Sequence, residues 1–210
     1  MAEKQAVRAA EPRYGLTFPV VCIGMSAGAV KPLKELFESI SPKTGMAFIV
    51  VHHLHKIPTL LPEILAKRTE MPVQLASAGT ELEPNHVYIL PSGQEMTMAD
   101  GYFLLGPRTK LRGWTNVFSL LLESLSKSRH QGIAVVLSGL DEDGASALEK
   151  FNDTGGITIV QAPKSAERPE MPEAAIHTGL VDYVLAPGAI AAELERIALD
   201  FRDGASAAAN

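Results

Sequence analysis

Three kinds of side chain that together could catalyse hydrolysis each follow a short apolar run in this sequence. Ser26 follows the run over 20–23, histidines follow the run over 47–51, and acidic residues follow the run over 133–137. These histidines and acids are His52, His53, His55, Asp141, Glu142 and Asp143. A hydroxyl nucleophile, an imidazole base and a carboxylate that orients the imidazole are the parts of a Ser-His-Asp triad. The pattern therefore predicts a hydrolytic site if the fold brings the three segments together.

Ser26 lies in the stretch G-M-S-A-G over 24–28, which fits the G-x-S-x-G pattern of a nucleophile elbow. Its small neighbours leave room around the hydroxyl. The helix expected next would direct backbone N–H groups, including those of Ala27 and Gly28, toward an oxyanion. In α/β-hydrolases, however, the acid precedes the histidine, whereas here it follows. A plain turn serine and a phosphate-binding loop are therefore alternatives, although no P-loop lysine accompanies the glycines.

The histidines and the acids also allow other interpretations. In an extended strand His53 and His55 would share one face and His52 would point to the other, so one imidazole could reach the serine. His-x-His resembles a metal-ligand pair, and an acidic cluster could hold Mg²⁺. No third ligand follows the histidines at close spacing. Acids that precede a helix commonly cap it, so Asp141, Glu142 and Asp143 are also candidate caps.

The elements that would position these residues alternate between buried strands and amphipathic helices. Such alternation predicts a doubly wound α/β fold, with a mostly parallel sheet covered by helices on both faces. Ligands of such sheets bind beyond the carboxyl ends of the strands, where the candidate residues stand. An A-D-G turn between short apolar runs predicts an antiparallel hairpin around 87–105, inserted into the sheet. The strands are expected at 20–23, 47–51, 73–75, 133–137, 157–160 and 183–185, and helices near 33–40, 60–65, 115–127, from 143, 172–177 and 189–199.

The bulk composition is that of one ordinary globular domain. Of 210 residues, 46% are hydrophobic and 20% are charged, and the formal net charge is −5. No basic block suggests a nucleic-acid partner, and no apolar stretch is long enough to insert into a membrane. The one cysteine, Cys22, lies in an apolar run. We expect a cytoplasmic protein with a flexible tail over 1–18, a single domain over 19–202 and a flexible C-terminal tail over 203–210.

Several short motifs, in order, resemble the catalytic domain of bacterial chemotaxis protein-glutamate methylesterases. They are IGMSAGA, VVHHLH, LEPNHVYILPSG, LSGLDEDGASAL, TGGITIVQ, EMPEAAI and GLVDYVLAP, and the resemblance runs from about residue 20 to about residue 197. It implies that Ser26 is the nucleophile, His53 the base and Asp143 the acid. It also implies that the backbone N–H near Leu140 forms part of the oxyanion hole and that Met171 borders the site.

The resemblance implies hydrolysis of γ-glutamyl methyl esters on the cytoplasmic domains of methylated chemoreceptors, with release of methanol. Some members of this family also deamidate receptor glutamines. The implied chemistry uses no metal and no organic cofactor. Most members carry an N-terminal receiver domain, in whose place this chain has an 18-residue tail. The expected partners are therefore chemoreceptors and, for regulation, a separate receiver-type protein.

The chain departs from the family pattern at three positions near the site. Ala27 stands where threonine is usual, Ala29 where a second glycine is usual, and Glu170 where a glycine usually precedes Met-Pro. These departures motivate an alternative, a catalytically weakened methylesterase-like module that signals or binds outside chemotaxis. A metal-dependent hydrolase built from the histidines and acids is the third hypothesis.

Overall fold

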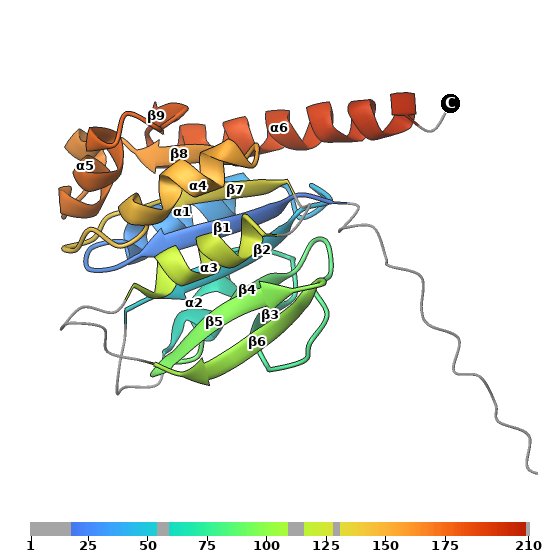
Figure 1. Cartoon of the computed structure of the whole chain (residues 1–210), viewed down its shortest axis with the longest axis horizontal. Helices are drawn as coiled ribbons and strands as arrows, with labels where there is room; N and C mark the ends of the chain where they lie inside the picture. The colour runs from blue at the N-terminus through green and yellow to red at the C-terminus, as the bar shows by residue number, and fades with distance from the viewer. Residues whose placement is uncertain (1–17, 54–58, 109–115, 128–130, 209–210) are drawn as a thin grey trace, which may run out of the picture.

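A parallel seven-stranded sheet forms the centre of the computed structural model, which describes residues 18–53, 59–108, 116–127 and 131–208 (Figure 1). The strand order is β3-β4-β2-β1-β7-β8-β9, and every pair in this sheet is parallel. The doubly wound α/β fold is thereby confirmed. The strands are β1 (Val20–Met25), β2 (Ala47–His52), β3 (Val73–Leu75), β4 (Val87–Ile89), β7 (Gly132–Val136), β8 (Ile157–Gln161) and β9 (Tyr183–Leu185).

Helices cover both faces of this sheet because its central strands are buried on both sides. β1, β2 and β7 are apolar and buried along their whole length, as expected of strands between two helical layers. One face packs against α1 (Val30–Ser39), α2 (Leu61–Leu65) and α6 (Pro187–Ala208). The other face packs against α3 (Val117–Leu125), α4 (Leu148–Asp153) and α5 (Glu170–His177), with short 3₁₀ turns η1 (Ala145–Ala147) and η2 (Pro163–Ser165) nearby.

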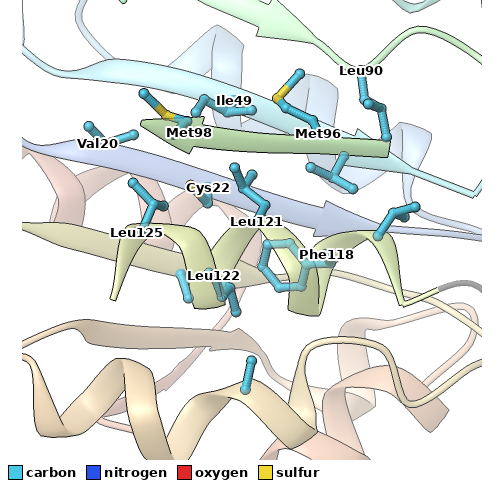
Figure 2. Close-up of a cluster of buried hydrophobic side chains, with 14 of the residues drawn as sticks. Val20, Cys22, Ile49, Leu90, Met96, Met98, Phe118, Leu121, Leu122 and Leu125 are labelled. Carbon is cyan, nitrogen blue, oxygen red and sulfur yellow. The ribbon is translucent and has the colours of Figure 1, made fainter. Parts of the chain in front are cut away.

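Alternate residues along β1 and β2 enter the two cores in turn, as the pleat of a strand requires. Cys22 and Ile49 lie in the core on the α3 side, whereas Ile23 and Val50 lie in the core on the α1 side. Figure 2 shows the first of these cores, in which the labelled Leu121 of α3 lies in one cluster with Cys22. Cys22 is fully buried, and burial raises the pKa of its thiol above the usual range.

The antiparallel hairpin is shorter than predicted and forms a sheet of its own. β5 (Gln94–Ala99) and β6 (Tyr102–Pro107) pair with each other, Tyr102 forms an isolated bridge with Glu81, and α3 packs against β5 (Figure 1). The turn residues Asp100 and Gly101 have φ of 51° and 85°, the positive values that a tight type I′ turn requires. The segment over 87–89, which was assigned to the hairpin, is instead β4 of the main sheet. The reason is that it is buried on both faces, whereas the hairpin strands expose one side.

The last helix extends beyond its predicted end at residue 199. α6 continues to Ala208, so residues 203–208 of the expected C-terminal tail are helical. Alanine, which dominates this stretch, is the best helix former, and it outweighs the single Gly204. The expected N-terminal tail lies outside the described residues except for Phe18, which packs against the core on the α3 side. Within the described part of the chain, no helix is long and apolar enough to cross a membrane.

Candidate active site

The three segments that carry the candidate residues meet at one edge of the sheet. β1 lies between β2 and β7, with Met25 opposite His52 and Gly24 opposite Val136. Because all three strands are parallel, their carboxyl ends stop side by side. The serine turn, the end of β2 and the loop after β7 therefore begin from adjacent points.

Ser26 sits at the start of the loop from β1 to α1, half-buried and tightly enclosed. Its N–H donates to the carbonyl of Ser138 at 3.0 Å, which joins this loop to the loop after β7. A Cβ on residue 139 would lie 2.9 Å from the Ser26 Cβ and 2.7 Å from the Met171 sulfur. The absence of a side chain at Gly139 thus permits the close approach of this residue to both Ser26 and Met171.

His53 continues the series of β2 side chains that face α3, and its imidazole lies between two carboxylates. Nδ1 is 2.5 Å from Asp141 Oδ2, and Nε2 is 2.8 Å from Asp143 Oδ2. The Ser26 side chain lies near the Asp141 carboxylate. The structure thus places His53 in contact with Asp143, and the register of β1 with β2 brings Ser26 to the same edge of the sheet. It also places a further carboxylate, that of Asp141, in contact with the imidazole.

Asp143 is held rigidly because it also caps a helix. Its carboxylate accepts the backbone N–H groups of Phe118 at 2.8 Å and of Ser119 at 2.9 Å, and the Ser119 hydroxyl at 2.8 Å. These amides belong to the first turn of α3, whose own N-cap residue, Asn116, makes no side-chain cap. A cap was expected from the acids, but the capped helix precedes Asp143 in the chain instead of following it. The side chain of Asp143 is 2% exposed.

The two aspartates set the charge of the imidazole. Burial by itself would lower the pKa of His53, but the hydrogen bonds and negative charges of Asp141 and Asp143 outweigh it and raise this pKa to about 9. Burial would raise the pKa of Asp141, and contact with His53 reverses this and lowers it. His53 is therefore an imidazolium at neutral pH in this arrangement. By contrast, burial and the nearby charge of Arg108 lower the pKa of His52 to about 4.

Arg108, at the end of the hairpin, is a part of the site that the sequence did not reveal. Its guanidinium donates to the carbonyls of His52 at 3.1 Å and His53 at 3.2 Å, and its Nε donates to the carbonyl of Gln94 at 3.3 Å. The hairpin is thereby joined to the end of β2. No local pattern signals this contact, because it forms across 55 positions of the chain.

Ser138 is a second residue that sequence reasoning missed. Its buried hydroxyl lies 2.8 Å from the carbonyl of Ala27, to which it can donate, and accepts the N–H of Arg168 at 2.9 Å. A Cβ on Gly28 would lie 2.8 Å from the same hydroxyl and 2.7 Å from Glu167 Cβ. The serine loop and the segment that leads into α5 are therefore packed around one hydroxyl group. The sequence signal that could have identified Ser138 is a polar residue directly after the buried strand β7.

Two backbone amides beside Ser26 could bind an oxyanion. Within the described residues, neither the N–H of Ala27 nor that of Leu140 donates to a backbone carbonyl, and both residues are exposed. The residue after a nucleophile commonly supplies one such donor.

The hypothesis of a metal site included His55, which lies outside the described residues. Among the residues that are described, no group of three or more histidine, cysteine or acidic side chains has the arrangement of a metal site.

Comparison with known proteins identifies the family. A family model described as CheB methylesterase matches residues 21–194. The chain belongs to this family. A protein-glutamate methylesterase/protein-glutamine glutaminase from Syntrophus aciditrophicus is 30% identical over 185 residues, which are 86% of this chain and 53% of that protein. A protein of the same description from Hahella chejuensis is 30% identical over 85% of this chain and 52% of its own length.

A solved structure confirms that the family shares this fold. The crystal structure of the Thermotoga maritima CheB methylesterase catalytic domain matches with a TM-score of 0.79 and 25% identity, covering 87% of this chain and all of that one. The chain spans about half the length of the two curated relatives named above. The matched solved structure is a catalytic domain, and the chain covers the whole of it.

Proposed function

We propose that this chain is the catalytic unit of a protein-glutamate methylesterase that acts on chemoreceptors. The observation that supports this proposal most strongly is the contact between His53 and Asp143 beside Ser26, at three adjacent strand ends of a CheB-family fold. The substrate would be the γ-methyl ester of a glutamate side chain. A receptor glutamine amide is a second substrate of similar shape, consistent with the double names of the relatives.

In the proposed mechanism Ser26 attacks the ester carbonyl while neutral His53 takes the hydroxyl proton. The N–H groups of Ala27 and Leu140 would stabilise the tetrahedral oxyanion. His53 then protonates the departing methoxide, so that methanol leaves and an acyl-serine remains. A water molecule, deprotonated by His53, hydrolyses the acyl-serine to the glutamate carboxylate and restores Ser26. Throughout these steps Asp143 orients the imidazole, because its carboxylate is held in place by the backbone N–H groups at the start of α3.

The proposal extends to the setting of the reaction. Chemoreceptor segments that carry methylated glutamates are on the cytoplasmic side, so we propose a cytoplasmic location and the receptor cytoplasmic domain as the partner. Regulation by a receiver-type regulator is part of the same proposal. Ala27 and Glu170 are both exposed, so they are available to a bound receptor helix and not buried in the fold.

Methanol release from methylated receptor membranes tests the proposal. We expect turnover by the wild-type chain, a loss of at least about 10³-fold in Ser26→Ala and in His53→Ala, and no effect of a chelator. A fluorophosphonate probe followed by peptide mass spectrometry should label Ser26. Receptor binding without turnover would favour the weakened module, and turnover abolished by the chelator would favour the metal-dependent hydrolase.

A further inference from the structure

Asp141 is a second carboxylate in contact with the imidazole of His53. It lies in the loop after β7, and its Oδ1 accepts the N–H of Asp143 at 3.0 Å. Its Oδ2 contacts His53 Nδ1 at 2.5 Å, and the Ser26 side chain lies near the same carboxylate. The imidazole is therefore held between Asp141 and Asp143, with one more carboxylate than a Ser-His-Asp triad contains.

The hydrogen-bonding capacity of the imidazole determines which protonation state of His53 fits these contacts. A neutral imidazole has one N–H donor and one acceptor nitrogen, and an ionised carboxylate can only accept. Both nitrogens of His53 face carboxylate oxygens, so both contacts are satisfied together only by the doubly protonated ring. An imidazolium has no lone pair with which to take the proton of Ser26. The observed arrangement is therefore a resting state of the proposed catalytic site.

The two carboxylates differ in how firmly they are held. Asp143 makes three hydrogen bonds to the first turn of α3 and is buried. Asp141 is on a loop, its side chain is 12% exposed, and besides contacting His53 its carboxylate accepts the neighbouring N–H of Asp143. Of the two, Asp141 is the group that can move away. Its departure would leave Nδ1 as the nitrogen available to Ser26, with Nε2 still on Asp143.

We propose that Asp141 is a positioning residue that restrains the active site, keeping His53 protonated and its Nδ1 unavailable to Ser26 until the carboxylate is displaced. This proposal rests on the proposed roles of Ser26 and His53. The charged and titratable groups around the imidazole are Asp141 and Asp143 from the loop after β7, His52 from β2 and Arg108 from the hairpin. Only the first two carry negative charge, so removal of Asp141 halves the negative charge that holds the proton.

The test compares Asp141→Asn and Asp141→Ala with the wild-type chain. Asparagine keeps an acceptor for the Asp143 N–H and removes the charge, and alanine removes both. Glu142→Gln is the matched control, because Glu142 is the adjacent, exposed acid and its loss changes the net charge equally. Two quantities are measured from pH 5.5 to 10: the rate at which a fluorophosphonate labels Ser26, and the titration of His53 by NMR of the labelled ring.

We expect the wild-type labelling rate to rise with a midpoint near pH 9. Both Asp141 variants should move this midpoint, and the His53 titration, to lower pH by one unit or more. Since about 1% of an imidazole with that midpoint is neutral at pH 7, labelling at pH 7 should rise at least about tenfold. The rates at pH 10 should agree within a few-fold, and Glu142→Gln should follow the wild type.

Equal His53 titration midpoints in the wild type and both Asp141 variants would overturn the proposal. So would a folded Asp141→Ala variant that is not labelled at any pH while the wild type is, since Asp141 would then be required for the reaction. If no form is labelled up to pH 10 but the His53 midpoint shifts as expected, the nucleophile assignment is wrong and the restraint of the imidazole by Asp141 is upheld.

Discussion

Replacement of Asp143 should destabilise the whole domain as well as abolish the reaction. In Asp143→Ala, the backbone N–H groups of Phe118 and Ser119 lose their acceptor at the buried start of α3. Loss of a helix cap costs about 0.5–2 kcal/mol, a buried donor left without a partner about 1–3 kcal/mol, and removal of one partner of a buried ion pair about 3–5 kcal/mol. These effects overlap, so we expect a loss of about 3–5 kcal/mol in the free energy of unfolding.

Urea denaturation at pH 7 measures this loss, and a double-mutant cycle with His53→Ala divides it. The two helix amides remain when the imidazole is gone, so Asp143→Ala should still cost about 2 kcal/mol or more in the His53→Ala background. Asp143→Asn keeps one acceptor oxygen and should lose less, about 1–3 kcal/mol. Glu142→Ala, which removes the neighbouring exposed acid, should stay within about 0.5 kcal/mol of the wild type.

The reasoning fails if Asp143→Ala unfolds within 1 kcal/mol of the wild type. It also fails if the entire cost disappears in the His53→Ala background, because Asp143 would then serve the imidazole alone. Either result would show that the Asp143 carboxylate does not both orient the imidazole and cap α3, as its contacts in the structure indicate.

Three further predictions concern the same edge of the sheet. The pKa of His53 is raised in the folded chain, so protonated His53 should contribute fully to the free energy of unfolding below about pH 6.5, and this contribution should disappear as the pH rises through about 9. Urea unfolding across this range should show the decline in the free energy of unfolding, and His53→Gln should abolish this pH dependence. Gly139→Ala places a methyl group within 2.9 Å of the Ser26 Cβ and should slow fluorophosphonate labelling at least about tenfold, whereas Gly188→Ala, in open space, should not. Ser138→Ala should lower the unfolding free energy by about 0.5–1.5 kcal/mol in urea titrations, because the partly buried N–H of Arg168 loses its acceptor.

The parts of the fold that follow from local periodicity were predictable from the sequence. Continuous apolar runs gave the positions of the central strands, and apolar stripes at helical spacing gave α1 and α3. Strand parity also placed His53 opposite to His52. The hairpin was predicted to start too early. The run over 87–90 is apolar in the same way as the core strands, and the structure buries it on both faces and pairs it with β2 and β3.

The contacts that control the chemistry were beyond sequence reasoning because they join distant segments. Asp143 caps a helix that begins 26 positions earlier in the chain, and Arg108 contacts the end of β2 across 55 positions. Asp141, Glu142 and Asp143 are three acids of the same kind in sequence. Their different roles arise only from where the backbone after β7 turns, which sends the Asp143 carboxylate to α3, the Asp141 carboxylate to His53 and the Glu142 carboxylate to solvent.

The charges of the site also suit the change that the proposed reaction makes in its substrate. Asp141 and Asp143 carry two negative charges and the imidazolium of His53 one positive charge. A methyl ester or a primary amide is neutral and enters such a site without electrostatic repulsion. Hydrolysis converts it to a carboxylate, which would add a third negative charge close to the other two. Repulsion between like charges in a partly buried site then favours departure of the product over its retention, so the carboxylate that restrains the base at rest would also help to clear the site after turnover.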